Sequence, residues 1–173
     1  MDLTELLKKI RLVVLDVDGV LTDGSIWLSG GDEFKRFHVK DGAGIKYLHR
    51  AGIQTAIITG RQSESVSRRA NELGIKECLQ GCLKKLPPYQ SLLERIGIPE
   101  AHVACMGDDL PDLPLFNHCG LKIAPADAAS EVRERADIVT ASYGGNGAVR
   151  EAAEIILKAQ GCWQKPLEGY IAQ

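Results

Sequence analysis

Short apolar runs alternate with stretches of helical spacing along this chain. Each run is nearly continuous in hydrophobic character, which is typical of strands buried on both faces of a parallel sheet. The expected strands are Leu12–Val17, Gln54–Thr59, Glu77–Gln80, Val103–Gly107, Leu121–Ala124 and Ile138–Thr140. The expected helices are Ala43–Ala51, Glu64–Leu73, Tyr89–Ile96, Asp112–His118, Ala128–Ala136 and Ala148–Gln160. This alternation predicts an α/β domain with a Rossmann-like, doubly wound parallel sheet.

One segment interrupts the alternation. Residues 25–28 and 33–39 are strand-like and flank Ser29-Gly30-Gly31-Asp32, a turn-forming sequence, so a β-hairpin is expected within residues 24–39. Its large apolar side chains are those of Ile26, Trp27, Phe34 and Phe37. A lone hairpin is marginally stable in water, so these side chains need cover. The hairpin either folds onto its own domain or packs against hairpins of neighbouring subunits, and we favour the second.

The length of 173 residues suits one domain with a continuous core, so residues 1–173 are expected to form a single domain. Residues 161–173 are expected to be a short irregular tail, whose Trp163 and Tyr170 are large enough to dock on another surface. Lys and Arg number 21 against 23 Asp and Glu, giving a net charge of −2. Nucleic acid is therefore an unfavoured partner, because no broad positive field is available.

The composition also bears on the location of the protein. Charged residues interrupt the N-terminal segment, and nowhere do about 18 uncharged apolar residues run together, so we expect neither export nor a membrane span. The 5 cysteines have no paired C-x-x-C spacing. Although Cys78 and Cys82 are close enough in sequence to share a metal, no second pair matches them, and free thiols are expected. A reducing cytoplasm suits this pattern.

Polar residues that suit phosphate chemistry follow the expected strands. Asp16 and Asp18 come at the end of the first strand, Thr59-Gly60-Arg61 after the second, Lys85 beyond the third, and Asp108-Asp109 after the fourth. The carboxyl ends of parallel strands share one edge of the sheet, where ligands bind. Carboxylates gathered there repel one another unless a divalent cation lies among them, and oxygen ligands suit Mg²⁺. A magnesium site is therefore predicted.

The same residues predict a two-step phosphoryl transfer. Asp16 is placed to attack phosphorus and form an aspartyl-phosphate, while Asp18 can protonate the leaving oxygen and then deprotonate the attacking water. The Thr59 hydroxyl, the Gly60 amide and the Lys85 ammonium are donors for the phosphoryl oxygens. Separately, these segments also read as a turn, a strand end and a helix N-cap. Their joint occurrence at one sheet edge favours catalysis.

Four motifs in order across residues 16–112 resemble the haloacid dehalogenase superfamily of phosphatases. The stretches D-V-D-G-V-L-T-D-G-S-I, A-I-I-T-G-R, G-D-D-L-P-D and G-G-N-G-A-V-R-E are similar in particular to the family of 3-deoxy-D-manno-octulosonate 8-phosphate phosphatases, over Leu12–Gln160. The resemblance implies that Asp16 is the nucleophile and Asp18 the acid/base. It implies that the metal ligands are Asp16, Asp18 and Asp108. It implies that Thr59 and Lys85 bind the phosphoryl group. It also implies that Asp109 and Asp112 hold metal-bound water and the lysine.

The resemblance further implies a substrate and an assembly. The substrate is a small anionic sugar phosphate of lipopolysaccharide precursor synthesis. The implied substrate contacts, beyond Asp18, Gly60 and Lys85, are His38, Lys40, Asp41, Gly42, Lys46, Arg61 and Arg69. A large cap domain is absent from the family, and a homotetramer with central hairpins closes the sites instead. For Arg61 and Arg69, a solvated helix face is the alternative interpretation.

Three of these positions depart from the usual family pattern. His38 and Lys40 stand where Asn and Arg are common, and Lys46 stands where Arg is common. A lysine does not reproduce the bidentate fork of an arginine. Phosphatases of nine-carbon sugar-acid phosphates therefore stay open as the alternative within the same class.

A phospho-accepting receiver domain is the alternative from a different class, since receivers also combine an acidic cluster, a phosphorylated Asp, a Thr and a Lys at strand ends. Their acidic pair follows the first strand and their acceptor comes later. This chain has the reverse order, with Asp16 and Asp18 first and Asp108-Asp109 later. Asp18 also supplies a turnover function that a signalling switch does not need. Motif order therefore favours the phosphatase.

Overall fold

Six parallel strands form the central sheet, in the order β5-β4-β1-β6-β7-β8. This computed structural model describes residues 2–30, 32–164, 166 and 168. The strands of the sheet are β1 (Leu12–Leu15), β4 (Gln54–Ile58), β5 (Glu77–Leu79), β6 (Val103–Met106), β7 (Leu121–Ala124) and β8 (Ile138–Val139). The strand order reverses between β1 and β6, which is where doubly wound sheets bind ligands. The predicted fold class is confirmed.

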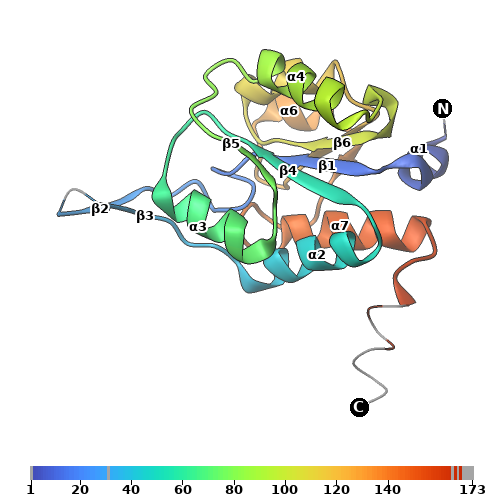
Figure 1. Cartoon of the computed structure of the whole chain (residues 1–173), viewed down its shortest axis with the longest axis horizontal. Helices are drawn as coiled ribbons and strands as arrows, with labels where there is room; N and C mark the ends of the chain where they lie inside the picture. Colours follow the sequence, from blue (N-terminus) through green and yellow to red (C-terminus); the bar gives the residue numbers. More distant parts are fainter. Residues whose placement is uncertain (1, 31, 165, 167, 169–173) are drawn as a thin grey trace.

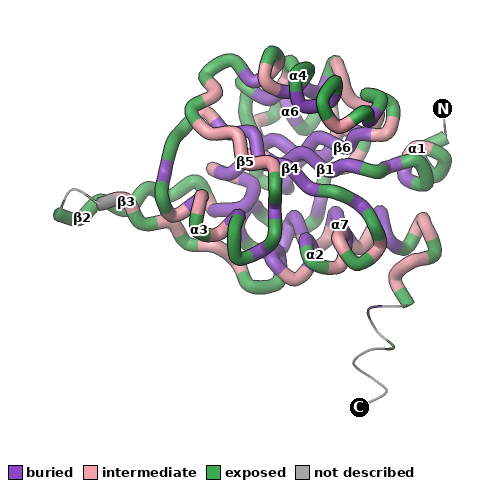
Figure 2. Tube along the Cα trace, in the orientation of Figure 1, coloured by how far each residue is buried: buried purple, intermediate pink, exposed green. Residues whose placement is uncertain are grey.

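Helices cover both faces of the sheet. They are α1 (Leu3–Lys9), α2 (Val39–Arg50), α3 (Glu64–Leu73), α4 (Leu86–Ile96), α5 (Leu113–Phe116), α6 (Ser130–Arg133) and α7 (Ala148–Ala159), with short 3₁₀ helices at Glu100–His102 (η1) and Leu110–Asp112 (η2). Figure 1 shows α2, α3 and α7 on one face and α4 and α6 on the other. Val13 and Leu15 of β1 join one buried cluster, and Val14 joins the other. Figure 2 shows β1 and β6 buried between the two layers of helices. Burial on both faces explains why the strands are continuously apolar.

Helix boundaries differ from the sequence prediction where packing between helices outweighs local propensity. The helix α2 begins at Val39 rather than Ala43, although Gly42 and Gly44 disfavour helix. A Cβ on Gly44 would lie 3.0 Å from the Cα of Arg150, so this glycine allows α2 and α7 to pack closely. The sequence pattern also did not predict α1, a short helix that is capped at its N-terminus by the Asp2 side chain.

The predicted hairpin is present, with strands shorter than expected. The strands β2 (Trp27–Ser29) and β3 (Asp32–Phe34) are antiparallel, and the hairpin extends away from the body of the domain (Figure 1). The chain leaves the hairpin at Phe37, which packs partly against the main core. The exposed apolar side chains of the hairpin are Ile26, Trp27, Leu28 and Phe34. They are therefore not covered by their own domain.

A glycine-rich loop late in the chain packs on the loop that follows β1. A Cβ on Gly144 would lie 1.8 Å from the carbonyl oxygen of Gly19, so only a glycine allows this approach. The Gly145 amide donates to the Val20 carbonyl at 2.9 Å. The carboxylate of Asp41 joins α2 to the start of α7, because it accepts from the Gly147 amide at 3.2 Å and the Arg150 amide at 2.8 Å.

The start of the C-terminal tail docks on the domain. The Trp163 ring lies edge-on to the Tyr47 ring, with centroids 5.8 Å apart, and the Arg150 guanidinium lies 5.2 Å from the Trp163 ring centroid. The predicted docking is confirmed for Trp163, whereas Tyr170 lies outside the described residues. No helix in the described ranges has both the length and the apolar character needed to span a bilayer.

Candidate active site

A pocket of about 300 Å³ lies at the carboxyl ends of the central strands. Its lining residues are Asp16, Asp18, Gly19, Gly24, Thr59, Gly60, Arg61, Lys85, Asp108, Asp109, Pro111 and Asp112. They come from the ends of β1, β4 and β6 and from the residues that precede α4. The structure thus brings together every residue for which the sequence predicted a role in metal binding, phosphoryl binding or catalysis.

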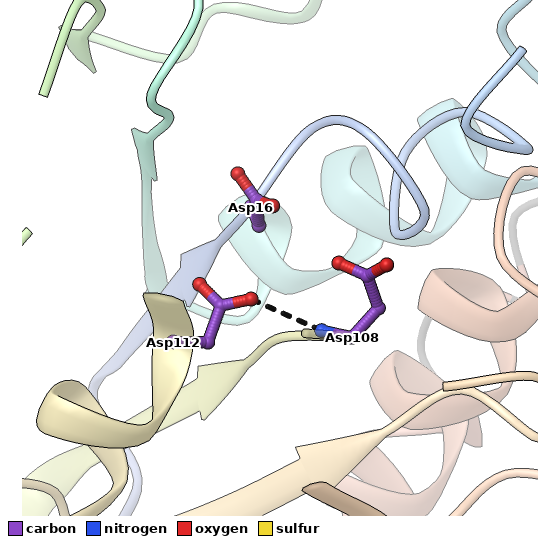
Figure 3. A group of neighbouring side chains, drawn as sticks. All are labelled: Asp16, Asp108 and Asp112. Carbon is purple, nitrogen blue, oxygen red and sulfur yellow. Dashed lines mark hydrogen bonds between the residues drawn. The ribbon is translucent and has the colours of Figure 1, made fainter. Parts of the chain in front are cut away.

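Three carboxylates converge at the floor of this pocket. Asp16, Asp108 and Asp112 each offer a ligand oxygen, and these oxygens all lie within 4.8 Å of one another (Figure 3). The ligand set that the resemblance implies has Asp18 rather than Asp112 beside Asp16 and Asp108, and that set stays a prediction. The Asp18 side chain turns instead towards Lys35 of the hairpin, as described below. If Asp18 is a ligand, its backbone carbonyl would supply the oxygen.

The electrostatics of the three carboxylates favour a bound cation. Burial, followed by repulsion from Asp112, raises the pKa of Asp16 to about 6. Burial, followed by repulsion from Asp16 and Asp112, raises the pKa of Asp108 to about 8. Oxygen Oδ1 of Asp16 is buried and makes no aligned hydrogen bond. An all-oxygen donor set of three carboxylates, with only one ammonium beside it, suits Mg²⁺, so these residues fit the predicted metal.

Lys85 supplies the positive charge of the pocket floor. Its ammonium lies 2.9 Å from Asp16 Oδ1 and 2.6 Å from Asp112 Oδ1, and its side chain is only 4% exposed. Burial acts to lower the pKa of Lys85, but attraction to Asp16 and Asp112 outweighs it and the net shift is upwards. The ammonium is therefore held charged, directly beside the predicted nucleophile.

Asp112 organises the floor around itself. Its Oδ1 accepts from Lys85, and its Oδ2 accepts from the backbone amides of Asp108 at 3.1 Å and Asp109 at 3.4 Å. Both oxygens are therefore engaged, which favours a role in holding Lys85 and the turn after β6 over metal ligation. The Asp109 carboxylate is more exposed and accepts from the Leu110 amide at 2.8 Å. Its predicted contact with metal-bound water stays a prediction.

The backbone conformation at position 19 and the closeness of Asp108 explain why a glycine follows Asp16 and Asp18. Its φ of +84° is in the left-handed region, and a Cβ at this position would lie 2.0 Å from Asp108 Oδ2. The absence of a side chain lets the Asp108 carboxylate approach the loop after β1. The loop geometry and the acidic cluster are thus parts of one arrangement.

The hairpin contributes a charged residue that sequence reasoning missed. Lys35 Nζ lies 2.5 Å from Asp18 Oδ1 and 3.1 Å from Glu33 Oε1. Glu33 and Lys35 point towards the domain, whereas Phe34 and Arg36 are exposed, which is the alternation of an extended strand. This period of two along residues 33–36 is the signal in the sequence from which Lys35 was predictable.

Comparisons with known proteins place the chain in a family. Residues 83–151, which include Lys85, Asp108 and Asp112, match the model of the haloacid dehalogenase-like hydrolases. The 3-deoxy-D-manno-octulosonate 8-phosphate phosphatase KdsC of Escherichia coli (strain K12) is 46% identical over 155 residues, 89% of this chain and 82% of that protein. The chain belongs to the KdsC family of haloacid dehalogenase-like hydrolases.

Solved structures of KdsC-family proteins agree over nearly the whole chain. One is the phosphatase of Moraxella catarrhalis in complex with a magnesium ion, a phosphate ion and a KDO molecule. It has a TM-score of 0.94 and 43% identity, and covers 96% of this chain and 97% of that one. Another is the cobalt-bound form of the Haemophilus influenzae phosphatase, with a TM-score of 0.88 and 44% identity, covering 90% of this chain and 92% of that one.

Several residues that the KdsC-family resemblance predicted as substrate contacts lie outside the pocket of their own chain. Asp41 is 1% exposed and bonds to the start of α7, so within one chain it joins two helices. Gly42 is buried, and a Cβ there would lie 2.3 Å from Arg69 Nη2. Arg69 pairs with Glu72 and lies 5.8 Å from the Phe37 ring centroid, where it lines a separate cavity of about 340 Å³.

The other three predicted contacts lie on or before α2. His38 precedes the helix, and its buried Nδ1 lies 3.9 Å from Asp41 Oδ2 without a hydrogen bond. Lys40 and Lys46 are exposed on the helix itself. None of the three lines the pocket of about 300 Å³ in the described part of the chain. Of the predicted substrate contacts, the structure therefore brings Asp18, Gly60, Arg61 and Lys85 to the pocket.

Proposed function

We propose that this protein is a Mg²⁺-dependent phosphatase that hydrolyses 3-deoxy-D-manno-octulosonate 8-phosphate to the free sugar acid and phosphate, in the synthesis of lipopolysaccharide precursors. The observation that carries the proposal is the cluster of Asp16, Asp108, Asp112 and Lys85 at the strand ends of a KdsC-family fold. The structure from Moraxella catarrhalis, with magnesium, phosphate and KDO bound, supports both the metal and the sugar.

In the first half-reaction an Asp16 carboxylate oxygen forms a bond to phosphorus, and the bond from phosphorus to the sugar oxygen breaks. Asp18 gives a proton to that departing oxygen, so the sugar leaves as an alcohol. Lys85, the Thr59 hydroxyl and the Gly60 amide hold the phosphoryl oxygens in line for the attack. All five residues line the same pocket, as this step requires.

In the second half-reaction a water oxygen forms a bond to phosphorus, and the bond to Asp16 breaks. Asp18 takes the proton from that water and is returned to its starting state. Asp16 and Asp108, with the Asp18 carbonyl, would hold Mg²⁺, while Asp112 fixes Lys85. When bound, the cation neutralises charge on the carboxylates and on the phosphoryl oxygens.

We also propose a homotetramer and a cytoplasmic location. The uncovered apolar side chains of the hairpin support assembly through this segment, as do the predicted contacts such as His38 and Lys40 that lie outside the pocket of their own chain. All five cysteines are free, which suits a reducing compartment. Sedimentation analysis of the protein and of a Trp27→Glu variant tests the assembly, because a charge at the hairpin contact would dissociate it.

The substrate is tested with a panel of ulosonate phosphates. Purified protein with Mg²⁺ should release phosphate from the eight-carbon 8-phosphate far faster than from nine-carbon 9-phosphates or simple hexose phosphates. A faster rate with the nine-carbon compound would move the assignment to the alternative named above. Equal rates across the panel would remove the claim of a specific sugar acid.

The nucleophile is tested by Asp16→Asn. This near-isosteric change should abolish turnover while the far-ultraviolet spectrum and the oligomer size stay unchanged. Acid-quenched protein from the wild type should carry a phosphoryl group that hydroxylamine releases, and the variant should carry none. Phosphate release by Asp16→Asn at the wild-type rate would show that another group attacks phosphorus.

A further inference from the structure

The hairpin places a buried ammonium against the carboxylate that handles the proton. We propose that Lys35 is a positioning residue, which fixes the Asp18 carboxylate in the orientation needed to reach the leaving oxygen. The inference rests on the proposed function and adds a residue to it. It also makes the hairpin part of the catalytic apparatus, separately from any role in assembly.

The burial of Lys35 is the first observation. Its side chain is 1% exposed, and its Nζ lies 2.5 Å from Asp18 Oδ1 and 3.1 Å from Glu33 Oε1. A charge removed from water in this way is stable only where opposite charges compensate it. The two carboxylates provide that compensation. The Lys35 ammonium is therefore held directly against the carboxylate of Asp18, the predicted acid/base.

The second observation is that Asp18 is contacted at both oxygens. Arg61 Nε lies 3.8 Å from Asp18 Oδ2, and Arg61 Nη2 lies 2.5 Å from Glu33 Oε2. Asp18, Lys35, Glu33 and Arg61 thus form a closed ring of alternating charge. An aspartate side chain in a loop has several staggered rotamers open to it, and this ring selects one of them. Such selection matters because a displacement of about 1 Å at a reacting group can cost about 10²-fold in rate.

The third observation is that the extended segment carrying Lys35, directly after β3, is fastened on both sides. Ser65, in the first turn of α3, donates to the Glu33 carbonyl at 3.2 Å. On the other side, Arg36 donates to Asp23 at 2.8 Å and to Asn146 at 3.1 Å. Lys35 is therefore delivered from a segment that the domain itself holds in place. This is the rigidity that a positioning residue requires.

The alternative is that Lys35 merely attaches the hairpin to the domain. The two roles differ in how they depend on the leaving group. A sugar alkoxide needs the proton from Asp18, whereas 4-nitrophenolate leaves as a stable anion and does not. A positioning role therefore predicts a selective loss with the sugar phosphate. An attachment role predicts equal effects on both compounds, because it does not act through Asp18.

The experiment measures leaving-group release in the first turnover, with the intact protein and Mg²⁺, for 3-deoxy-D-manno-octulosonate 8-phosphate and for 4-nitrophenyl phosphate. For Lys35→Met, sugar release should fall on the order of 10²-fold while nitrophenolate release stays at the wild-type rate. The affinity for Mg²⁺, measured by calorimetry, should also stay at the wild-type value. Arg36→Met is the matched control, because it loosens the same strand without touching Asp18, and it should show no selective loss.

Equal slowing of both compounds by Lys35→Met, no slowing of either, or the same selective loss in Arg36→Met would each overturn the inference. If Lys35→Met does not fold, the double variant Glu33→Gln/Lys35→Met removes one charge of each sign and should show the same selective loss. A wild-type protein that acts on neither compound would defeat the proposed function itself. That outcome is distinct from an active wild type whose Lys35→Met variant is unselective.

Discussion

Two lysines are buried at the site, one beneath the sheet edge and one on the hairpin, and their surroundings differ. The partners of Lys85 are also largely buried, since the side chains of Asp16 and Asp112 are 10% and 4% exposed. The partners of Lys35 reach water, since the side chains of Asp18 and Glu33 are 24% and 17% exposed. The difference indicates that Lys85 belongs to the fold as well as to the chemistry, whereas Lys35 is separable from the fold.

The largest expected effect comes from Lys85→Met. It leaves the Asp16 and Asp112 carboxylates buried without their cation, so unfolding free energy should fall by about 3–5 kcal/mol. Lys35→Met should cost about 1–2 kcal/mol, because its partners can be hydrated. Urea titrations of both variants in the presence of a chelator measure the two values. Activity of Lys85→Met should fall about 10²–10³-fold, as for other lost donors to a transition-state oxyanion.

Similar losses of stability in the two variants would break the distinction between the two lysines. A destabilised Lys35→Met variant with a stable Lys85→Met variant would reverse it. The chelator is needed in both titrations because a bound metal adds its own binding free energy to the folded state.

Alanine substitutions at two glycines, one at the pocket and one in the hairpin, extend the comparison of these two regions and have a smaller expected effect. Gly19→Ala places a Cβ 2.0 Å from Asp108 Oδ2, so Mg²⁺ affinity should fall about 10-fold or more. Gly30→Ala, in the hairpin, has a φ of +58° but meets no heavy atom within 4 Å. It should therefore cost only the local backbone strain of about 1–2 kcal/mol and leave Mg²⁺ affinity unchanged. Calorimetric titration with Mg²⁺ would contradict the expectation if both variants bound equally.

The smallest expected effect is the pH-dependent contribution of His49 to stability, at the edge of the sheet opposite the pocket. His49 Nε2 lies 2.7 Å from Thr55 Oγ1, and burial lowers the pKa of His49 below its ordinary value of 6.5. The unfolded chain therefore takes up the proton first as the pH falls. The stabilisation linked to neutral His49 is present above about pH 6.5 and is lost below it.

Thermal unfolding of wild type and His49→Gln, compared between about pH 7.5 and about pH 5.5, measures this baseline. The wild type should lose more stability on acidification than the variant does. Equal losses of stability in the wild type and the variant would assign the acid sensitivity to the carboxylates beside Lys85 and Lys35 instead. Because stability depends on pH in either case, the stability losses of Lys85→Met and Lys35→Met are compared at one pH.

Sequence reasoning located the sheet edge well because strand and motif signals are local there. Each apolar run ends at a residue with an oxygen or nitrogen suited to phosphate, and parallel strands bring such ends to one place. Asp16, Thr59, Lys85 and Asp108 were predicted on that basis and share the pocket. Local patterns do not report side-chain direction in loops. The sequence therefore did not predict that the Asp18 carboxylate faces Lys35 while Asp112 joins Asp16 and Asp108 in the acidic cluster.

Features that depend on contacts between distant segments were missed. The hairpin was predicted from its turn, but the meeting of Lys35 with Asp18 follows from the way the strand folds back on the domain. The early start of α2 was missed because Gly44 reduces helix propensity, while its packing against Arg150 requires a glycine. Asp41 was predicted as a substrate contact from resemblance, and its bond to the start of α7 was not predicted. In each case the deciding atom comes from elsewhere in the chain.

The packing of Gly144 and Gly145 on the loop after β1 bears on when the protein becomes competent during its synthesis. The nucleophile leaves the ribosome early, yet the glycines that support its loop are translated only after most of the chain. A nascent polypeptide would contain the whole D-x-D motif long before Gly144 and Gly145 could pack on the loop that follows it. The loop that carries Asp18 therefore gains this support only after Gly144 and Gly145 have been translated, when most of the domain is already available to fold.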